Sequence, residues 1–245
     1  MEILERSGDT IIALLNIEDL KDHEQINESY LAELTRKIKE DKEIKVPIVV
    51  DKHSNVVLDG HHRFYALKKL GCRRIPAFVV DYYNPDIKLN CWNHFVKKEE
   101  EREAVFDCLK EHNFLTSTVE SEDVIKTLLS SGQAILGIAA RNGGNNFFIV
   151  QSEDKKQTFE DALKCIKTGL SKELDYIPDA ISMEDAMREQ KASLVMIIPT
   201  VEKSDVVKKA VEGHPYPPKT TRHILSKHSE YPVPLRNLMS EERKD

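Results

Sequence analysis

The chain has 245 residues, 40% of them hydrophobic and 32% charged, a composition typical of a folded protein. Lys and Arg number 36 against 42 Asp and Glu, so the net charge of −6 leaves no broad cationic surface for nucleic acid or anionic lipid. Apolar runs such as 134–140 are far shorter than the ~20 residues that cross a bilayer, and the acidic start at Glu2 and Glu5 is unlike a signal peptide, which predicts a cytoplasmic protein.

The first predicted elements are a strand, a turn and a helix. Hydrophobic periodicity indicates a strand at 11–15, and a polar turn follows that carries His23-Glu24-Gln25. A helix is predicted at 28–40, with Asn27 as its N-cap. The turn is therefore held between two regular elements.

The next segment has the order strand, glycine, helix, glycine, strand. Residues 46–50 and 55–58 flank a polar link and predict a hairpin. A helix is expected directly after Gly60, at 61–70, with Gly71 at its C′ position. A strand at 75–80 completes the segment.

The second half is predicted to be mixed α/β. A strand at 87–92 leads into an acidic run that starts a helix, and we place a domain boundary at residue 107. Beyond it we expect helices at 121–130, 158–169, 183–189 and 205–212, strands at 134–140, 147–150 and 193–198, an Asn/Gly turn at 142–146, and a short strand before the third of these helices. Three prolines in 213–218 predict a stiff loop that carries residues 219–223.

The four cysteines show no pattern of a known framework. Cys72, Cys91, Cys108 and Cys165 are widely spaced and form no C-x-x-C pair. The sequence therefore predicts reduced thiols, with neither a disulfide framework nor a zinc knuckle.

The residues Asp59-Gly60-His61-His62-Arg63 form the strongest chemical signal. A helix that opens directly after a glycine offers free backbone N–H groups and a positive dipole end, which together bind phosphate. The two histidines and Arg63 add donors in the same turn. An ordinary helix start with solvated polar residues is an equally good interpretation of the spacing alone.

This segment resembles the nucleotide-binding motif of the ParB and sulfiredoxin superfamily. Together with 23–25 and the late segment 218–223, it is similar to the free L-serine kinases of that superfamily, with the three motifs in the same order. Sulfiredoxins carry a reactive cysteine where this chain has His61, and ParB partition proteins continue into a basic helix-turn-helix, whereas the downstream half here is acidic and strand-rich. Neither sulfiredoxin activity nor chromosome partition is therefore expected.

The resemblance implies roles for the N-terminal residues. A ParB/sulfiredoxin-like domain, 1–107, would hold nucleotide phosphates at Gly60, His61, His62 and Arg63, and a mixed α/β domain, 108–245, would close the substrate cleft. Glu24 becomes the catalytic carboxylate, although from the residues alone it is one surface acid among 42. Asp59 becomes a second one, as a Mg²⁺ ligand, a base or a helix cap, and the sequence leaves these open.

The resemblance also implies substrate-binding residues outside the phosphate motif. Trp92 is the only tryptophan, and such a residue on a strand is usually core, but the family places an aromatic near the substrate. A group of cationic and hydroxyl side chains follows the prolines: Lys219, Thr220, Thr221, Arg222 and His223. Such side chains are suited to binding the carboxylate and the new phosphate of an amino acid. The alternative interpretation is a solvated basic loop.

The expected function is therefore a kinase. It would transfer a phosphoryl group from ATP or ADP, with Mg²⁺, to free L-serine and give O-phospho-L-serine, with no nucleic acid or membrane as partner. The alternatives are a ParB-like regulator that binds nucleotide without phosphoryl transfer, and a ParB-like nuclease. A nuclease needs a cationic groove, which the acidic composition of this chain does not indicate. The choice between ATP and ADP stays open, as does the oligomeric state.

Overall fold

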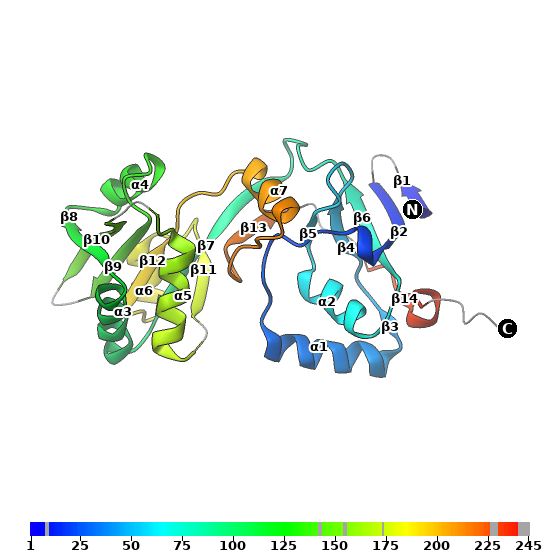
Figure 1. The fold of residues 1–245 in the computed structure, drawn as a ribbon, viewed down its shortest axis with the longest axis horizontal. Helices are drawn as coiled ribbons and strands as arrows, with labels where there is room; N and C mark the ends of the chain where they lie inside the picture. The colour runs from blue at the N-terminus through cyan, green and yellow to red at the C-terminus, as the bar shows by residue number, and fades with distance from the viewer. Residues whose placement is uncertain (8–9, 142–143, 154–155, 173, 226–229, 240–245) are drawn as a thin grey trace. The chain divides into compact units, whose positions relative to one another are not determined.

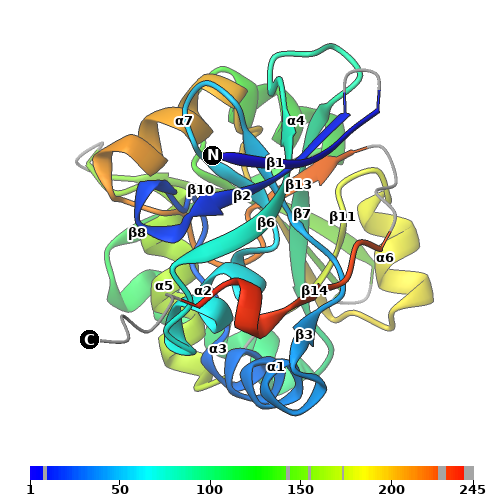
Figure 2. The same cartoon turned by 90° about the vertical axis from the view of Figure 1, so that its right-hand side faces the viewer.

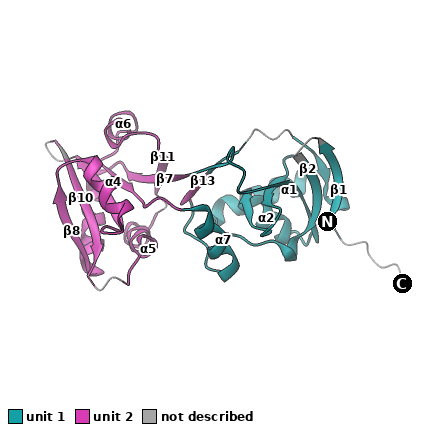
Figure 3. Ribbon diagram, turned by 90° about the horizontal axis from the view of Figure 1, so that it is seen from above, with its two compact units in different colours: residues 1–89, 202–218, 223–245 teal, residues 90–201, 219–222 magenta. Residues whose placement is uncertain are grey.

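A computed structural model describes residues 1–7, 10–141, 144–153, 156–172, 174–225 and 230–239. The chain forms two compact units (Figure 3): unit 1 comprises Met1–Leu89, Glu202–Pro218 and His223–Asp245, and unit 2 comprises Asn90–Val201 and Lys219–Arg222. These units differ from the predicted domains 1–107 and 108–245. The chain enters the second sheet before residue 107, and it returns to unit 1 after Val201.

Unit 1 is built on a five-stranded sheet with two helices beside it (Figure 1). The strands, in spatial order, are β1 (Glu2–Ser7), β2 (Thr10–Asn16), β6 (Arg74–Val80), β4 (Ile48–Asp51) and β5 (Val57–Asp59). Neighbours are antiparallel except β4 and β6, which run parallel. Helices α1 (Glu28–Asp41) and α2 (His61–Lys69) pack against each other.

Local sequence signals place these elements as expected. The Asn27 side chain accepts a hydrogen bond from the backbone N–H of Tyr30 and caps α1, which buries Leu31 and Ile38. Gly60 is the N-cap of α2, and Gly71 follows its C-cap residue with a φ of 76°. The predicted hairpin, helix and strand of this segment are confirmed.

Unit 1 also includes segments from beyond residue 201. After α7 (Lys203–Glu212), the backbone N–H of Tyr216 donates to the carbonyl of His23, and that of Gln25 donates to the carbonyl of Tyr216. Further along, β14 (Val233–Pro234) pairs with β3 (Glu43–Ile44). The elements β1, β3, β14, η1 (Ile17–Asp19) and η2 (Leu235–Asn237) were not predicted. Elements of two or three residues carry too little periodicity to be recognised, and the six residues of β1 include the charged side chains of Glu2, Glu5 and Arg6.

Unit 2 is a second sheet with helices on both faces, drawn in magenta in Figure 3. Its strand order is β11 (Asp175–Pro178), β7 (Lys88–Val96), β12 (Leu194–Ile197), β9 (Leu136–Arg141), β10 (Asn145–Ser152) and β8 (Phe114–Val119). Helices α4 (Glu122–Ser130) and α6 (Met183–Glu189) cover the face that carries Phe95. Helices α3 (Glu99–Glu111) and α5 (Phe159–Leu170) pack against each other.

The segment after the prolines differs from its prediction as a loop. Thr221–Ile224 forms β13, which pairs with β7. The pairing gives the backbone polar groups of this segment partners that the local sequence does not reveal. β8 was also missed, because most of its side chains are exposed and it lacks an apolar run. Of the predicted turn at 142–146, residues 142–143 lie outside the described part of the chain.

The mixed α/β class predicted from the sequence is confirmed in both units. Among the described residues, none of the helices combines the length and the apolar character that crossing a bilayer requires. The four cysteines are buried, and none of them forms a disulfide in the described part of the chain.

Candidate functional site

The start of α2 requires a glycine at position 60. Gly60 has a φ of +94°, in the left-handed region, and a Cβ there would lie 2.7 Å from Cγ2 of Ile48 and 2.9 Å from Nη2 of Arg63. Without that Cβ, the backbone turns sharply from β5 into the helix. The first N–H groups of α2 and its positive dipole end thus form the kind of terminus that binds phosphate.

The guanidinium of Arg63 is engaged inside unit 1. Its Nη1 donates to the carbonyls of Val46, at 2.9 Å, and Pro47, at 2.5 Å, and its Nη2 donates to Oδ2 of Asp59 at 2.5 Å. The side chain is only 19% exposed, whereas that of Asp59 is 56% exposed. Arg63 therefore braces the turn before α2. Asp59 is not a helix cap, because the N-cap is Gly60 and α2 has no side-chain cap bond.

His62 connects the beginnings of the two helices of unit 1. Its Nε2 accepts a hydrogen bond from the backbone N–H of Asn27 at 3.1 Å, and its ring centroid lies 4.8 Å from that of Tyr30. His62 therefore helps to fix the start of α1 against the start of α2.

Three histidines and a tyrosine of unit 1, His23, His61, His223 and Tyr82, form what we call the histidine cluster. Nδ1 of His23 donates to the carbonyl of Val57 at 2.7 Å, and Nε2 of His61 lies 3.2 Å from the same Nδ1. The rings of His23 and His223 are 5.2 Å apart, and the Tyr82 hydroxyl lies 2.8 Å from Nε2 of His223. The cluster joins four separate segments of the chain.

Burial makes these imidazoles poor bases. It lowers the pKa of His23 to about 4, against an ordinary value of 6.5, and outweighs the hydrogen bond to Val57. Burial, followed by the charge on neighbouring histidines, holds the pKa of His61 and that of His223 well below the usual range. The cluster is therefore neutral at pH 7 and offers hydrogen-bond donors and acceptors, not positive charges.

Glu24 lies beside this cluster, in the turn between β2 and α1. It is half-buried, and its backbone forms a parallel bridge with Tyr216. The hydrogen bonds that Tyr216 makes to His23 and Gln25 hold the chain on both sides of Glu24. The backbone at Glu24 is thus held by a contact with the C-terminal part of unit 1.

Unit 2 carries a second group of predicted residues, the aromatic–cation cluster of Trp92, Tyr176, Lys219 and Arg222. The Nζ of Lys219 lies 5.4 Å from the ring centroid of Trp92 and 4.7 Å from that of Tyr176. The Cζ of Arg222 lies 5.3 Å from the Trp92 centroid. Trp92 is therefore a half-buried platform for cations and not a core residue.

The remaining residues of the late motif are distributed differently. Thr220 and Thr221 are buried, whereas His223 belongs to the histidine cluster of unit 1. Successive side chains of a strand point to opposite faces, so β13 presents Arg222 and His223 in opposite directions. One strand thus supplies a residue to each cluster.

Sequence reasoning missed Tyr82 and Lys203. The Nζ of Lys203 donates to the carbonyls of Tyr82, at 2.7 Å, and Asn84, at 3.2 Å, and lies 5.2 Å from the Tyr82 ring centroid. More than 100 positions separate Lys203 from these partners, and no local motif surrounds either residue. His23 was quoted in a motif but was given no role of its own.

Comparison with known proteins defines the class. A family model of the ParB N-terminal domain matches residues 4–88, which include the hairpin, α2 and the turn with Glu24. A solved structure of a free serine kinase in complex with AMP has the same fold, with a TM-score of 0.76 at 20% identity over 98% of this chain and 97% of that one. The chain is a ParB N-terminal domain protein with an additional α/β unit.

The relatives place it more narrowly. An ATP-dependent L-serine kinase of Desulfurococcus mucosus is 31% identical over 225 residues, or 86% of this chain and 84% of that protein. An ADP-dependent L-serine kinase of Thermococcus kodakarensis is 24% identical over 215 residues, or 86% of each. The chain belongs to the family of the free L-serine kinases, which confirms the resemblance found in its sequence.

Proposed function

We propose that this protein is a free L-serine kinase that transfers a phosphoryl group from ATP or ADP to the serine hydroxyl. The observation that carries the proposal is the placement of Glu24. Glu24 is half-buried, and backbone bonds hold the chain at this residue beside a neutral histidine cluster, in the same unit as the N-terminus of α2. A module that only binds nucleotide has no need of a carboxylate held in this way. The family relationship supports serine as the substrate.

The phosphates of the donor would bind at the N-terminus of α2. There the backbone N–H groups after Gly60 and the neutral ring of His61 provide hydrogen-bond donors. Arg63 would act mainly by bracing this turn, since its donors already serve two carbonyls and Asp59.

Asp59 is the residue that would hold Mg²⁺. Its carboxylate is 56% exposed and stands directly before the helix N-terminus, and such oxygen atoms are the hard ligands that Mg²⁺ prefers. Mg²⁺ is usually held by one or two carboxylates together with substrate phosphates, so a single Asp fits this arrangement. When bound, the ion would neutralise charge on the transferring phosphoryl group.

Glu24 would orient the serine hydroxyl and accept its proton. As the bond from the serine oxygen to phosphorus forms, the bond from phosphorus to the leaving nucleotide oxygen breaks, and the hydroxyl proton moves to the carboxylate. The low pKa values of the histidines mean that the cluster does not compete for this proton at pH 7.

Serine would be recognised through its carboxylate by the aromatic–cation cluster. Arg222 and Lys219 keep their positive charges over the faces of Trp92 and Tyr176, and a guanidinium binds a carboxylate in bidentate fashion. The proposed phosphate-binding groups belong to unit 1, and the proposed carboxylate-binding groups belong to unit 2.

The test is incubation of the purified protein with L-serine, Mg²⁺ and either ATP or ADP, followed by mass detection of O-phosphoserine. We expect product with one donor and only background with the other, and a Glu24→Gln variant that binds nucleotide but makes no product. Nucleotide binding without phosphoserine from either donor would replace the kinase with a nucleotide-binding regulator. Release of nucleotides from added nucleic acid would favour a nuclease instead.

A further inference from the structure

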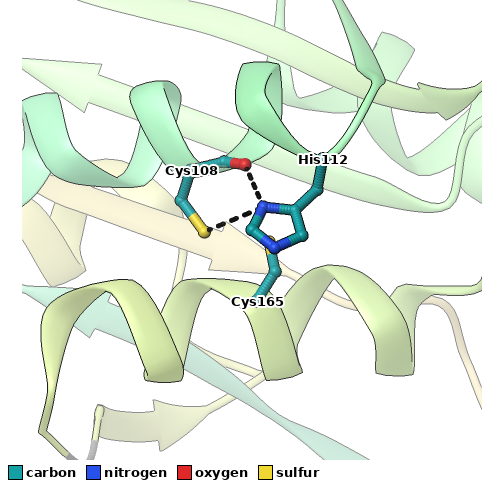
Figure 4. A group of neighbouring side chains, drawn as sticks. All are labelled: Cys108, His112 and Cys165. Atoms are coloured by element: carbon teal, nitrogen blue, oxygen red, sulfur yellow. Dashed lines mark hydrogen bonds between the residues drawn. The ribbon is translucent and has the colours of Figure 1, made fainter.

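Two cysteines and a histidine converge between α3 and α5 of unit 2, apart from the residues assigned above. Cys108 lies on α3, His112 is the C-cap residue of that helix, and Cys165 lies on α5. The two sulfur atoms and an imidazole nitrogen all lie within 4.8 Å of one another. Figure 4 shows the three side chains pointing into the space between the two helices.

The spacing along the helix brings two of the ligands together. Cys108 and His112 are four positions apart, so they share one face of α3 at its C-terminal end. Cys165 approaches from α5, which packs against α3. Two neighbouring helices therefore contribute the three side chains, without any C-x-x-C motif.

A hydrogen bond to the backbone orients the imidazole. Nδ1 of His112 donates to the backbone carbonyl of Cys108 at 2.9 Å and lies 3.8 Å from its Sγ. With the proton on Nδ1, the lone pair is on Nε2. Histidines that bind metals commonly fix their orientation with such a bond to a carbonyl oxygen.

The three side chains of the cluster differ in burial. Cys108 and Cys165 are 5% and 7% exposed, whereas His112 is exposed at the surface. On α5, one turn after Cys165, Gly169 faces Cys108, and a Cβ there would lie 3.2 Å from its Sγ. A larger residue at position 169 would crowd the sulfur.

We propose that Cys108, His112 and Cys165 form a binding site for a thiophilic divalent cation, of which Zn²⁺ is the probe. Two thiolates and an imidazole are ligands that Zn²⁺ prefers and that Mg²⁺ does not. A fourth position would be left for water. The ion would join the end of α3 to the middle of α5 and stabilise unit 2, independently of any kinase activity.

The first experiment measures zinc bound by the full chain, reduced, treated with a chelator and then loaded with Zn²⁺. We expect one tightly held ion per chain by elemental mass spectrometry, and a higher melting temperature with zinc than without it. Cys165→Ser and His112→Ala should each weaken the affinity at least about tenfold. Cys72→Ser, which changes a buried cysteine of unit 1, should leave it unchanged.

Spectroscopy distinguishes this site from zinc bound elsewhere. The Co²⁺-loaded protein should show thiolate-to-cobalt charge transfer in the near ultraviolet, and this absorption should fall in Cys108→Ser and in Cys165→Ser. His112→Ala keeps the test valid if the buried cysteine variants fold poorly, because His112 is exposed. The proposal is wrong if zinc binding survives in these variants, if the folded chain binds none, or if the purified protein carries a Cys108–Cys165 disulfide instead.

Discussion

The histidine cluster of unit 1 and the aromatic–cation cluster of unit 2 are built on opposite electrostatic principles. The first consists of rings whose pKa values are lowered, so it offers neutral hydrogen-bond donors and acceptors. The second places the side chains of Lys219 and Arg222 over aromatic faces, so it offers cationic groups. We infer that unit 1 holds the reacting groups, whereas unit 2 binds the carboxylate of the substrate. Variants in unit 1 and in unit 2 test this contrast.

The largest effect is expected from Glu24→Gln in unit 1. Loss of a general base costs about 10²–10⁴-fold in turnover, while nucleotide affinity should be nearly kept, because the change affects the transition state more than phosphate binding. Phosphoserine formation and calorimetric binding of nucleotide measure the two quantities. Glu33→Gln, an exposed glutamate on α1, is the matched control. Turnover near that of the wild type would make Glu24 a surface acid.

The second prediction concerns the stability of unit 1 at acidic pH. The folded pKa of His23, about 4, lies below its usual 6.5, so the unfolded chain binds the proton more readily between these values. The stability that neutral His23 contributes is fully present above pH 6.5 and is lost as the pH drops towards 4, by an amount on the order of 3 kcal/mol. His61 and His223 change the stability of unit 1 in the same direction. Urea unfolding at several pH values, monitored for unit 1, measures this.

A His23→Gln variant should show a smaller loss of stability over the same pH range, because the group that takes up the proton is gone. His53→Gln provides the control, since the side chain of His53 is exposed. His94 in unit 2, whose pKa burial lowers to about 3, changes stability in the same direction, so the unfolding of the two units must be followed separately. Equal slopes for the wild type and His23→Gln would contradict the prediction.

Arg63→Ala is expected to weaken both stability and nucleotide binding. Its guanidinium bridges two carbonyls and Asp59, and hydrogen bonds of charged groups are each worth about 1.5–3 kcal/mol. We expect unit 1 to lose about 1–3 kcal/mol of unfolding free energy, and nucleotide affinity to fall with it. Arg36→Ala, at an exposed site on α1, serves as the control. Weaker nucleotide binding at unchanged stability would instead identify Arg63 as a direct phosphate ligand.

The smallest effect is expected from unit 2. Arg222→Ala should raise the KM for serine about tenfold and change kcat little, because a contact to the substrate carboxylate exists in both the ground and the transition state. High salt should raise the KM of the wild type and have less effect on the variant. Arg188→Ala alters an exposed arginine of the same unit and is the control. An unchanged KM would leave the segment 219–222 as a basic surface.

The sequence by itself determined the local elements and the motifs. The cap at Asn27, the glycines at 60 and 71 and the apolar periodicities each act within a few residues, so they placed α1, α2 and most strands. The order of three motifs along the chain was enough to indicate the family. The pair of β3 and β14, the unit boundary and β13 were missed, because they depend on pairing with distant segments.

Only the tertiary structure decided how the side chains group. Burial by segments far apart in the chain lowers the pKa values of the histidines, and strand alternation in β13 separates Arg222 from His223. The prediction from the cysteine spacing considered only C-x-x-C pairs, whereas the packing of α3 on α5 brings Cys165 to Cys108 and His112. Distances between residues remote in sequence are set by packing, which no local pattern records.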